Sequence, residues 1–170
     1  MRADKRFIGW FLLAACTFIS GCGYHISGIG GRLPAGIESL SIPVFANSTS
    51  KPDIEAVVTG AFVNEFVTTV NVSDNAEARL LGEIRSYSLT PVSYTKKDVT
   101  QEYRLRLSIS LKMLSRDGRV LWQEDSIEDY EDFQVNASDI SATRDAELKA
   151  FKKLTSDTAR LVKERMLEGF

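Results

Sequence analysis

The stretch Glu-Tyr-Arg-Leu-Arg-Leu-Ser-Ile-Ser-Leu-Lys-Met-Leu, residues 102–114, decides the fold of this chain. Every second side chain from Tyr103 to Met113 is apolar, and the side chains between them are charged or small and polar. Strict alternation of this kind indicates a β-strand with one buried and one solvated face. We therefore predict an antiparallel sheet that is covered on a single side.

Three further strands flank this one along the chain. Asp117-Gly118 is a hairpin turn signal, so the next strand is expected to follow it at once. In the strand before residues 102–114 the apolar phase shifts after Ile84, which predicts a β-bulge near Ser86. The three strands are expected at residues 37–44, 78–92 and 120–130.

Two helices complete the predicted fold. Apolar side chains at helical spacing predict one helix from about Asp53 to Thr69 and a long one from about Ala142 to Leu167. The polar segment Glu131–Ser141 is predicted to be a loop. The order is strand, helix, strand, strand, strand, helix. We predict an α+β two-layer sandwich, with a four-stranded, mostly antiparallel sheet and both helices on one face.

The first 21 residues have the composition of an export signal. Three basic residues precede an apolar run, Phe7–Ile19. The run covers 13 residues, whereas a bilayer-spanning helix needs roughly 20. We predict that residues 1–21 are a signal peptide that is removed.

The end of this signal resembles the lipobox recognised by lipoprotein signal peptidase. Ile19-Ser20-Gly21-Cys22 has an aliphatic residue, two small residues and then the cysteine. We predict cleavage before Cys22 and lipidation of its thiol, which would anchor the chain to a membrane. Gly23, in place of an inner-membrane retention aspartate, favours the outer membrane. The alternative is an ordinary secretory signal with a chance cysteine.

Cleavage and lipidation would leave a mature chain without a free thiol. Cys16 leaves with the signal and Cys22 carries lipid, so neither can form a disulfide or hold a metal. The glycine-rich segment 22–36 is predicted to be a tether, and residues 37–170 a single domain. The net charge is −2, and −4 once three basic and one acidic signal residues are gone. An acidic chain is a poor nucleic-acid binder, so no nucleic-acid partner is expected.

No pattern in the sequence supports catalysis or a cofactor. His25 is the only histidine and follows the anchor in the tether, where a catalytic geometry is hard to hold. A cluster of carboxylates near residue 128 lacks the glycine turn of a calcium loop, so edge protection is the preferred interpretation and no metal site is predicted. Its members are Glu124, Asp125, Glu128, Asp129, Glu131 and Asp132.

Basic residues are the remaining candidates for ligand contact. Lys96 and Lys97 lie at the expected tip of the hairpin before residues 102–114, and Arg144 lies near the start of the last helix. Isolated surface cations are usually solubilising. Adjacent cations can also bind phosphate or carboxylate groups.

Several motifs together resemble the LptE family of lipopolysaccharide-assembly lipoproteins. The most specific is Cys22-Gly23-Tyr24-His25 at the mature N-terminus. The others are Leu33-Pro34, the strand Ser39–Phe45 with Asn47 beyond it, Glu102–Leu105, Val120–Trp122 and Tyr130–Phe133. The resemblance covers essentially the whole mature chain.

The resemblance implies a non-enzymatic role at the outer membrane. Members of this family sit as a plug inside the LptD β-barrel, assist its folding and help lipopolysaccharide pass to the outer leaflet. By position, lipopolysaccharide contact would fall to Lys96, Lys97 and Arg144. Two alternatives stay open: a periplasmic scaffold lipoprotein of another cell-envelope assembly complex, and a small envelope hydrolase.

Overall fold

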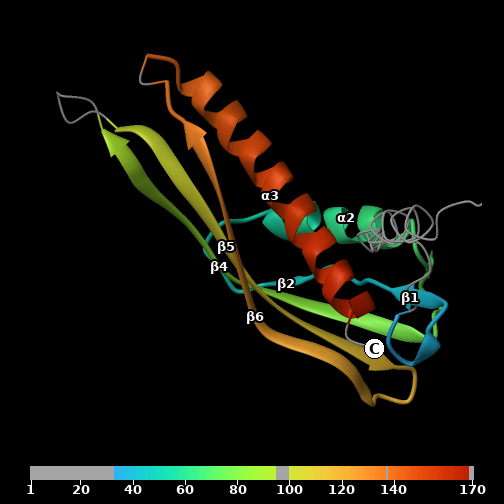
Figure 1. The fold of residues 1–170 in the computed structure, drawn as a ribbon. Coiled ribbons are helices and arrows are strands. Elements are labelled where there is room, and N and C mark those ends of the chain that lie inside the picture. Colours follow the sequence, from blue (N-terminus) through green and yellow to red (C-terminus); the bar gives the residue numbers. More distant parts are fainter. Residues whose placement is uncertain (1–32, 95–99, 137, 169–170) are drawn as a thin grey trace, which may run out of the picture.

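The computed structural model describes residues 33–94, 100–136 and 138–168. In it two helices, α2 (Ile54–Phe66) and α3 (Ile140–Glu168), lie on the same side of one sheet, as Figure 1 shows. The predicted α+β two-layer fold is therefore confirmed. Neither of these two helices is both long and apolar enough to cross a membrane.

The sheet has six strands, so the prediction of four was wrong. Its order is β3-β1-β4-β5-β6, and β2 pairs with β4 outside this path. The long strands are antiparallel to one another, whereas β1 is parallel to both of its neighbours and β2 is parallel to β4. The strands are β1 (Ser39–Ser41), β2 (Ala46–Asn47), β3 (Asn71–Val72), β4 (Ala78–Tyr94), β5 (Thr100–Ser115) and β6 (Val120–Gln134), and a 3-10 turn η1 (Pro34–Gly36) precedes them.

The strand boundaries differ most from the prediction at β6 and at β1, whereas β4 and β5 extend one or two residues beyond the predicted ends. β6 continues to Gln134, so the loop predicted from Glu131 is wrong over its first four residues. The predicted single strand at 37–44 is a short β1, after which the chain leaves the ladder around Pro43 and pairs again as β2. The bulge is confirmed: Ile84 pairs with Ile109 and Ser86 with Ser108, which leaves Arg85 as the extra residue.

The core lies between the sheet and the helices and is continuous. The alternate side chains of β5 from Leu105 to Met113 are buried, as the sequence pattern predicts. The Phe62 ring of α2 contacts Phe45 at 5.0 Å between ring centroids, and Phe66 stacks on it at 6.4 Å. Burying a side chain of this size contributes about 1.5–3 kcal/mol. These contacts hold α2 against the β1–β4 half of the sheet.

Candidate functional site

Of the predicted site residues, the structure describes Arg144 alone. Cys22, His25, Lys96 and Lys97 lie outside the described residues. Arg144 is an exposed residue near the start of α3. This helix begins at Ile140, earlier than predicted, because the Asp139 carboxylate accepts a hydrogen bond from the Ala142 N–H at 3.0 Å.

Arg144 lines a hollow of about 340 Å³ between the two helices and β4. Residues at the start of α2 and in the first half of α3 line it, together with Tyr87 of β4. The lining combines charged groups with apolar side chains. Its other members are Lys51, Pro52, Asp53, Ile54, Val57, Glu147, Leu148 and Phe151.

Glu147 is the centre of a hydrogen-bonded group beside Arg144. Its Oε1 atom accepts a hydrogen bond from Lys51 Nζ and another from the Tyr87 hydroxyl, each at 2.7 Å. The Lys51 ammonium also lies 5.2 Å from the centroid of the Tyr87 ring. The group thus joins the loop before α2, the strand β4 and the helix α3.

The environment shifts the protonation equilibria of this group. Partial burial raises the pKa of the Tyr87 hydroxyl far above its usual range, and the bond to Glu147 raises it further. Burial acts to raise the pKa of Glu147 as well, but the hydrogen bonds from Lys51 and Tyr87 outweigh it and the pKa is lowered. At neutral pH Glu147 is therefore a carboxylate and Tyr87 a neutral hydrogen-bond donor.

Glu147→Gln is expected to make the stability less dependent on pH in the acidic range. Because folding lowers the pKa of Glu147 below its ordinary value of 4.5, the carboxylate stabilises the fold above that pH and loses this contribution as the pH falls through the folded pKa. The free energy of unfolding of the wild type should exceed that of the variant by about 1 kcal/mol at pH 7, and this difference should become smaller as the pH falls below 4.5. Urea unfolding at pH 7 and at pH 3 measures it.

Glu164→Gln is the matched control, since Glu164 is an exposed residue of the same helix. Its unfolding free energy should follow that of the wild type at every pH. If the free energies of unfolding of Glu147→Gln and of the wild type differed by the same amount at pH 7 and at pH 3, the ionised carboxylate of Glu147 would not be what stabilises the wild type.

The outer face of the sheet, opposite the helices, carries a second ordered polar group. Arg104 of β5 donates to both carboxylate oxygens of Asp132 on β6, at 2.8 Å each. Its guanidinium also lies 4.1 Å from the centroid of the Tyr130 ring. The bonds from Arg104 hold the pKa of Asp132 below its usual range. This two-pronged pairing and the stacking fix the direction of all three side chains.

Next to this group the outer face has a shallow hollow of about 430 Å³. Serine side chains of β4 and β5 and the exposed Arg106 contribute to its lining. The surface is therefore largely polar and hydrogen-bonding, since Glu128 and Asp129 also contribute to the lining. It suits contact with another polar surface better than capture of a small ligand.

The acidic cluster of β6 is largely tied to other elements. Glu131 contacts Lys153 at 2.5 Å and Glu124 contacts Arg165 at 3.1 Å, both on α3. Within residues 33–94, 100–136 and 138–168, the acidic and histidine side chains form no group of three placed to hold a metal ion. The carboxylates on this edge strand therefore help to hold α3 over the sheet.

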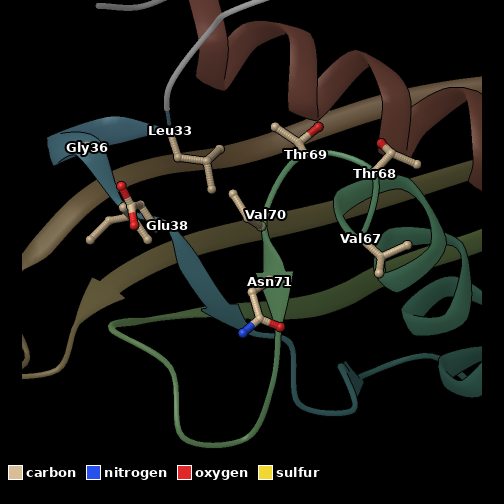
Figure 2. A pocket seen from close by; sticks show the side chains of 9 residues that line it. Leu33, Gly36, Glu38, Val67, Thr68, Thr69, Val70 and Asn71 are labelled. Atoms are coloured by element: carbon tan, nitrogen blue, oxygen red, sulfur yellow. The ribbon is translucent and has the colours of Figure 1, made fainter.

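A third hollow, of about 430 Å³, lies where the described chain begins. Figure 2 shows its lining, from Leu33 and Glu38 near η1 and β1 to Thr68 and Asn71 in the segment after α2. Among the described residues that line it, Glu38 alone is charged. Because a carboxylate repels an anion, this part of the lining does not favour phosphate binding.

The sequence did not reveal the two polar groups. Lys51 and Glu147 are 96 positions apart, and neither neighbourhood signals the pairing. Arg104 and Asp132 could have been matched by extending the alternation of the last strand. The predicted loop Glu131–Ser141 includes Asp132, so the prediction does not place this residue opposite Arg104, where the structure has it.

The described part of the chain presents ordered ion pairs and hollows with polar lining on a two-layer α+β scaffold, surfaces on which another protein or a charged ligand could bind. A family model described as "LptE: Lipopolysaccharide-assembly" matches residues 37–166. The chain belongs to the LptE family, whose members are non-enzymatic assembly lipoproteins.

Comparison with solved structures supports the fold. Lipoprotein B from Nitrosomonas europaea is 14% identical, with a TM-score of 0.53, over 85% of this chain and 90% of that one. A protein from Xanthomonas campestris is 11% identical, with a TM-score of 0.54, over 76% of this chain and 86% of that one. At such identities the likeness concerns the fold alone. A search of the curated proteins found no match.

Proposed function

We propose that this protein is an outer-membrane lipoprotein that plugs the LptD β-barrel, assists its assembly and helps deliver lipopolysaccharide to the outer leaflet. Residues 1–21 would be removed, Cys22 would carry the lipid anchor, and residues 22–36 would tether the domain formed by residues 37–170. The domain would lie at the periplasmic face of the membrane. Membership of the LptE family is the observation that carries the proposal.

The outer face of the sheet supports the barrel half of the proposal. In Figure 1 the long strands curve, and both helices lie on the inner side of the curve, so the outer face is convex. Arg104, Arg106 and Lys112 lie on this face among serines. Since the interior wall of a large membrane barrel is concave and polar, such a face fits against it.

The hollow beside Arg144 supports the lipopolysaccharide half. An exposed guanidinium binds phosphate through paired N–H donors, whereas the ammonium groups of Lys96 and Lys97 act as point charges. Apolar side chains such as Leu148, 46% exposed, lie in the same hollow. A cation beside apolar surface suits a ligand with both phosphate groups and acyl chains.

Reversing the three candidate cations is expected to weaken lipopolysaccharide binding. The combined change Lys96→Glu, Lys97→Glu and Arg144→Glu should raise the dissociation constant about tenfold or more, because charge-assisted contacts to phosphate are lost and repulsion replaces them. A titration of the purified protein with lipopolysaccharide at fixed salt measures this.

The control replaces exposed lysines of α3 that do not line the hollow. Lys149→Glu with Lys152→Glu should bind lipopolysaccharide nearly as well as the wild type. Equal binding by the triple variant and the wild type would refute the role of these cations.

The partner is tested by purifying the lipidated protein in mild detergent and weighing the intact complex by mass spectrometry. A barrel of the size of LptD, retained in a one-to-one complex, supports the plug. Retention of a different envelope protein would favour the scaffold alternative and overturn the proposal.

A further inference from the structure

The distal half of β4 has an edge that no other described strand covers. On the side away from β5, β1 pairs with Ala78 and Arg79, and β2 pairs with Glu83 and Ile84. The last backbone bond on this side runs from the Ser48 N–H to the Ile84 carbonyl oxygen at 3.0 Å. From Ser86 to Ser93, β4 is bonded within the described chain to β5 alone.

The direction of the backbone groups on this edge follows from the register. Because Ile84 bonds to Ser48, its backbone groups point away from its β5 partner Ile109. Steps of two residues along β5 preserve this direction, and they lead to Leu107, Leu105 and Tyr103. Their β4 partners are Tyr87, Leu89 and Pro91, whose backbone groups therefore face the open edge.

Pro91 supports this assignment independently. A proline within a sheet is tolerated where its missing N–H faces away from the neighbouring strand. The open edge thus offers the N–H groups of Tyr87 and Leu89 as donors, and the carbonyl groups of both, with that of Pro91, as acceptors. Pro91 also limits how far a regular ladder could extend.

The outer edge of β6 and the open edge of β4 differ in how they are protected against pairing with other strands. β6 carries a series of carboxylates, a usual device against unwanted strand pairing. Residues 86–94 of β4 contain no charged side chain. Leu89 is 37% exposed and Val92 41% exposed on this segment. An edge that is uncharged, and that no strand in the described part of the chain covers, is suited to accept another strand.

The side chains beside this edge indicate what kind of strand fits. Tyr87 and Leu89 face the helix side, where the hollow beneath Leu148 and Phe151 lies. Ser88 and Thr90 face the polar outer side. A strand added here would place alternate side chains against the partly apolar hollow on the helix side and against the polar outer surface. Strands of transmembrane barrels have this alternation of apolar and polar side chains.

We propose that the open edge of β4, at residues 86–91, pairs with one β-strand of the partner barrel and extends the sheet by β-augmentation. This inference rests on the proposed function, since the barrel is the partner assigned there. It adds a specific contact to that function: a strand segment of the barrel forms backbone bonds with this edge, and these bonds persist in the assembled complex.

Hydrogen exchange of backbone amides tests the inference directly. In the isolated protein the N–H groups of Tyr87 and Leu89 should exchange quickly, whereas those of Ser88 and Thr90 bond to β5 and exchange slowly. In the detergent-purified complex with the barrel, exchange at Tyr87 and Leu89 should slow by about tenfold or more. Mass spectrometry of peptides from β4 measures this change as slower uptake of deuterium in the complex.

The outcomes separate the inference from the proposed function. A retained barrel with unchanged exchange at Tyr87 and Leu89 overturns the edge pairing and leaves the plug intact. Absence of a retained barrel overturns both. Protection that appears in the isolated protein and grows with its concentration would assign the edge to a second copy of the chain, which also overturns the inference.

A pair of variants isolates the backbone donor from the side chain. Leu89→Pro removes an N–H that faces the open edge, and Leu89→Ala keeps the N–H but shortens the side chain in the same way. The yield of complex should be about tenfold lower for Leu89→Pro than for Leu89→Ala. Equal yields from two folded variants would overturn the inference, and the exchange measurement on the wild type decides it even where Leu89→Pro does not fold.

Discussion

Gly82→Ala is expected to lower the free energy of unfolding by about 2–3 kcal/mol. A Cβ atom at this position would lie 2.5 Å from the nearest atoms of the Phe45 ring. That ring is 2% exposed and packs on Phe62, so it has no free space into which it could move. Since domains of this size are stable by only about 5–15 kcal/mol, the loss is a large fraction of the total. Denaturant unfolding measures it.

Gly60→Ala is the control for this change. Gly60 lies in α2, and a Cβ atom built there has no neighbour within 4 Å. Alanine favours the helix by up to about 1 kcal/mol over glycine, so this variant should be at least as stable as the wild type. If both alanine variants shifted the unfolding midpoint equally and in the same direction, close packing on Phe45 would not be the reason for glycine at position 82.

The second large effect is expected from Cys22→Ser, which should abolish lipidation. Serine has no thiol to accept the diacylglyceryl group, and the lipoprotein peptidase acts after that step. Cells supplied with a palmitate analogue should label the wild type and leave the variant at background. The variant should also keep residues 1–21, which an increased mass reveals.

Cys16→Ser controls for the loss of a cysteine as such. Cys16 lies within the apolar run of the signal, so its replacement should leave both labelling and cleavage as in the wild type. Labelling of Cys22→Ser, or loss of labelling in Cys16→Ser, would show that the lipidated residue has been assigned wrongly.

The long elements could be predicted because their burial repeats over many residues. β5 buries each alternate side chain from Leu105 to Met113 and could be found from alternation alone. The bulge at Arg85 shifts the apolar phase, so it could be found as well. β2 and β3 are two residues long, too short for any repeat to appear, and they exist because β1 and β4 offer them backbone partners.

The group formed by Lys51, Tyr87 and Glu147 was beyond the reach of sequence patterns. Arg144 could be selected as a cation near a helix start, but its hollow is formed by β4 and by the loop before α2 as well. The bond between Lys51 and Glu147 depends on how α3 lies against α2. Such contacts depend on the distance between elements, which a repeat within one element does not encode.

The amino-acid sequence by itself determined the alternation of residues 102–114, the helical stripes and the order of apolar and small residues before Cys22, because each is a local property of neighbouring residues. Only the tertiary structure decided the strand order, the pairing of Lys51 with Glu147 and the open edge of β4. Strand order and open edges depend on which strands meet in space. A strand with neighbours on both sides and one with a free edge can have the same alternation of side chains, since alternation reports the faces of a sheet and not its edges.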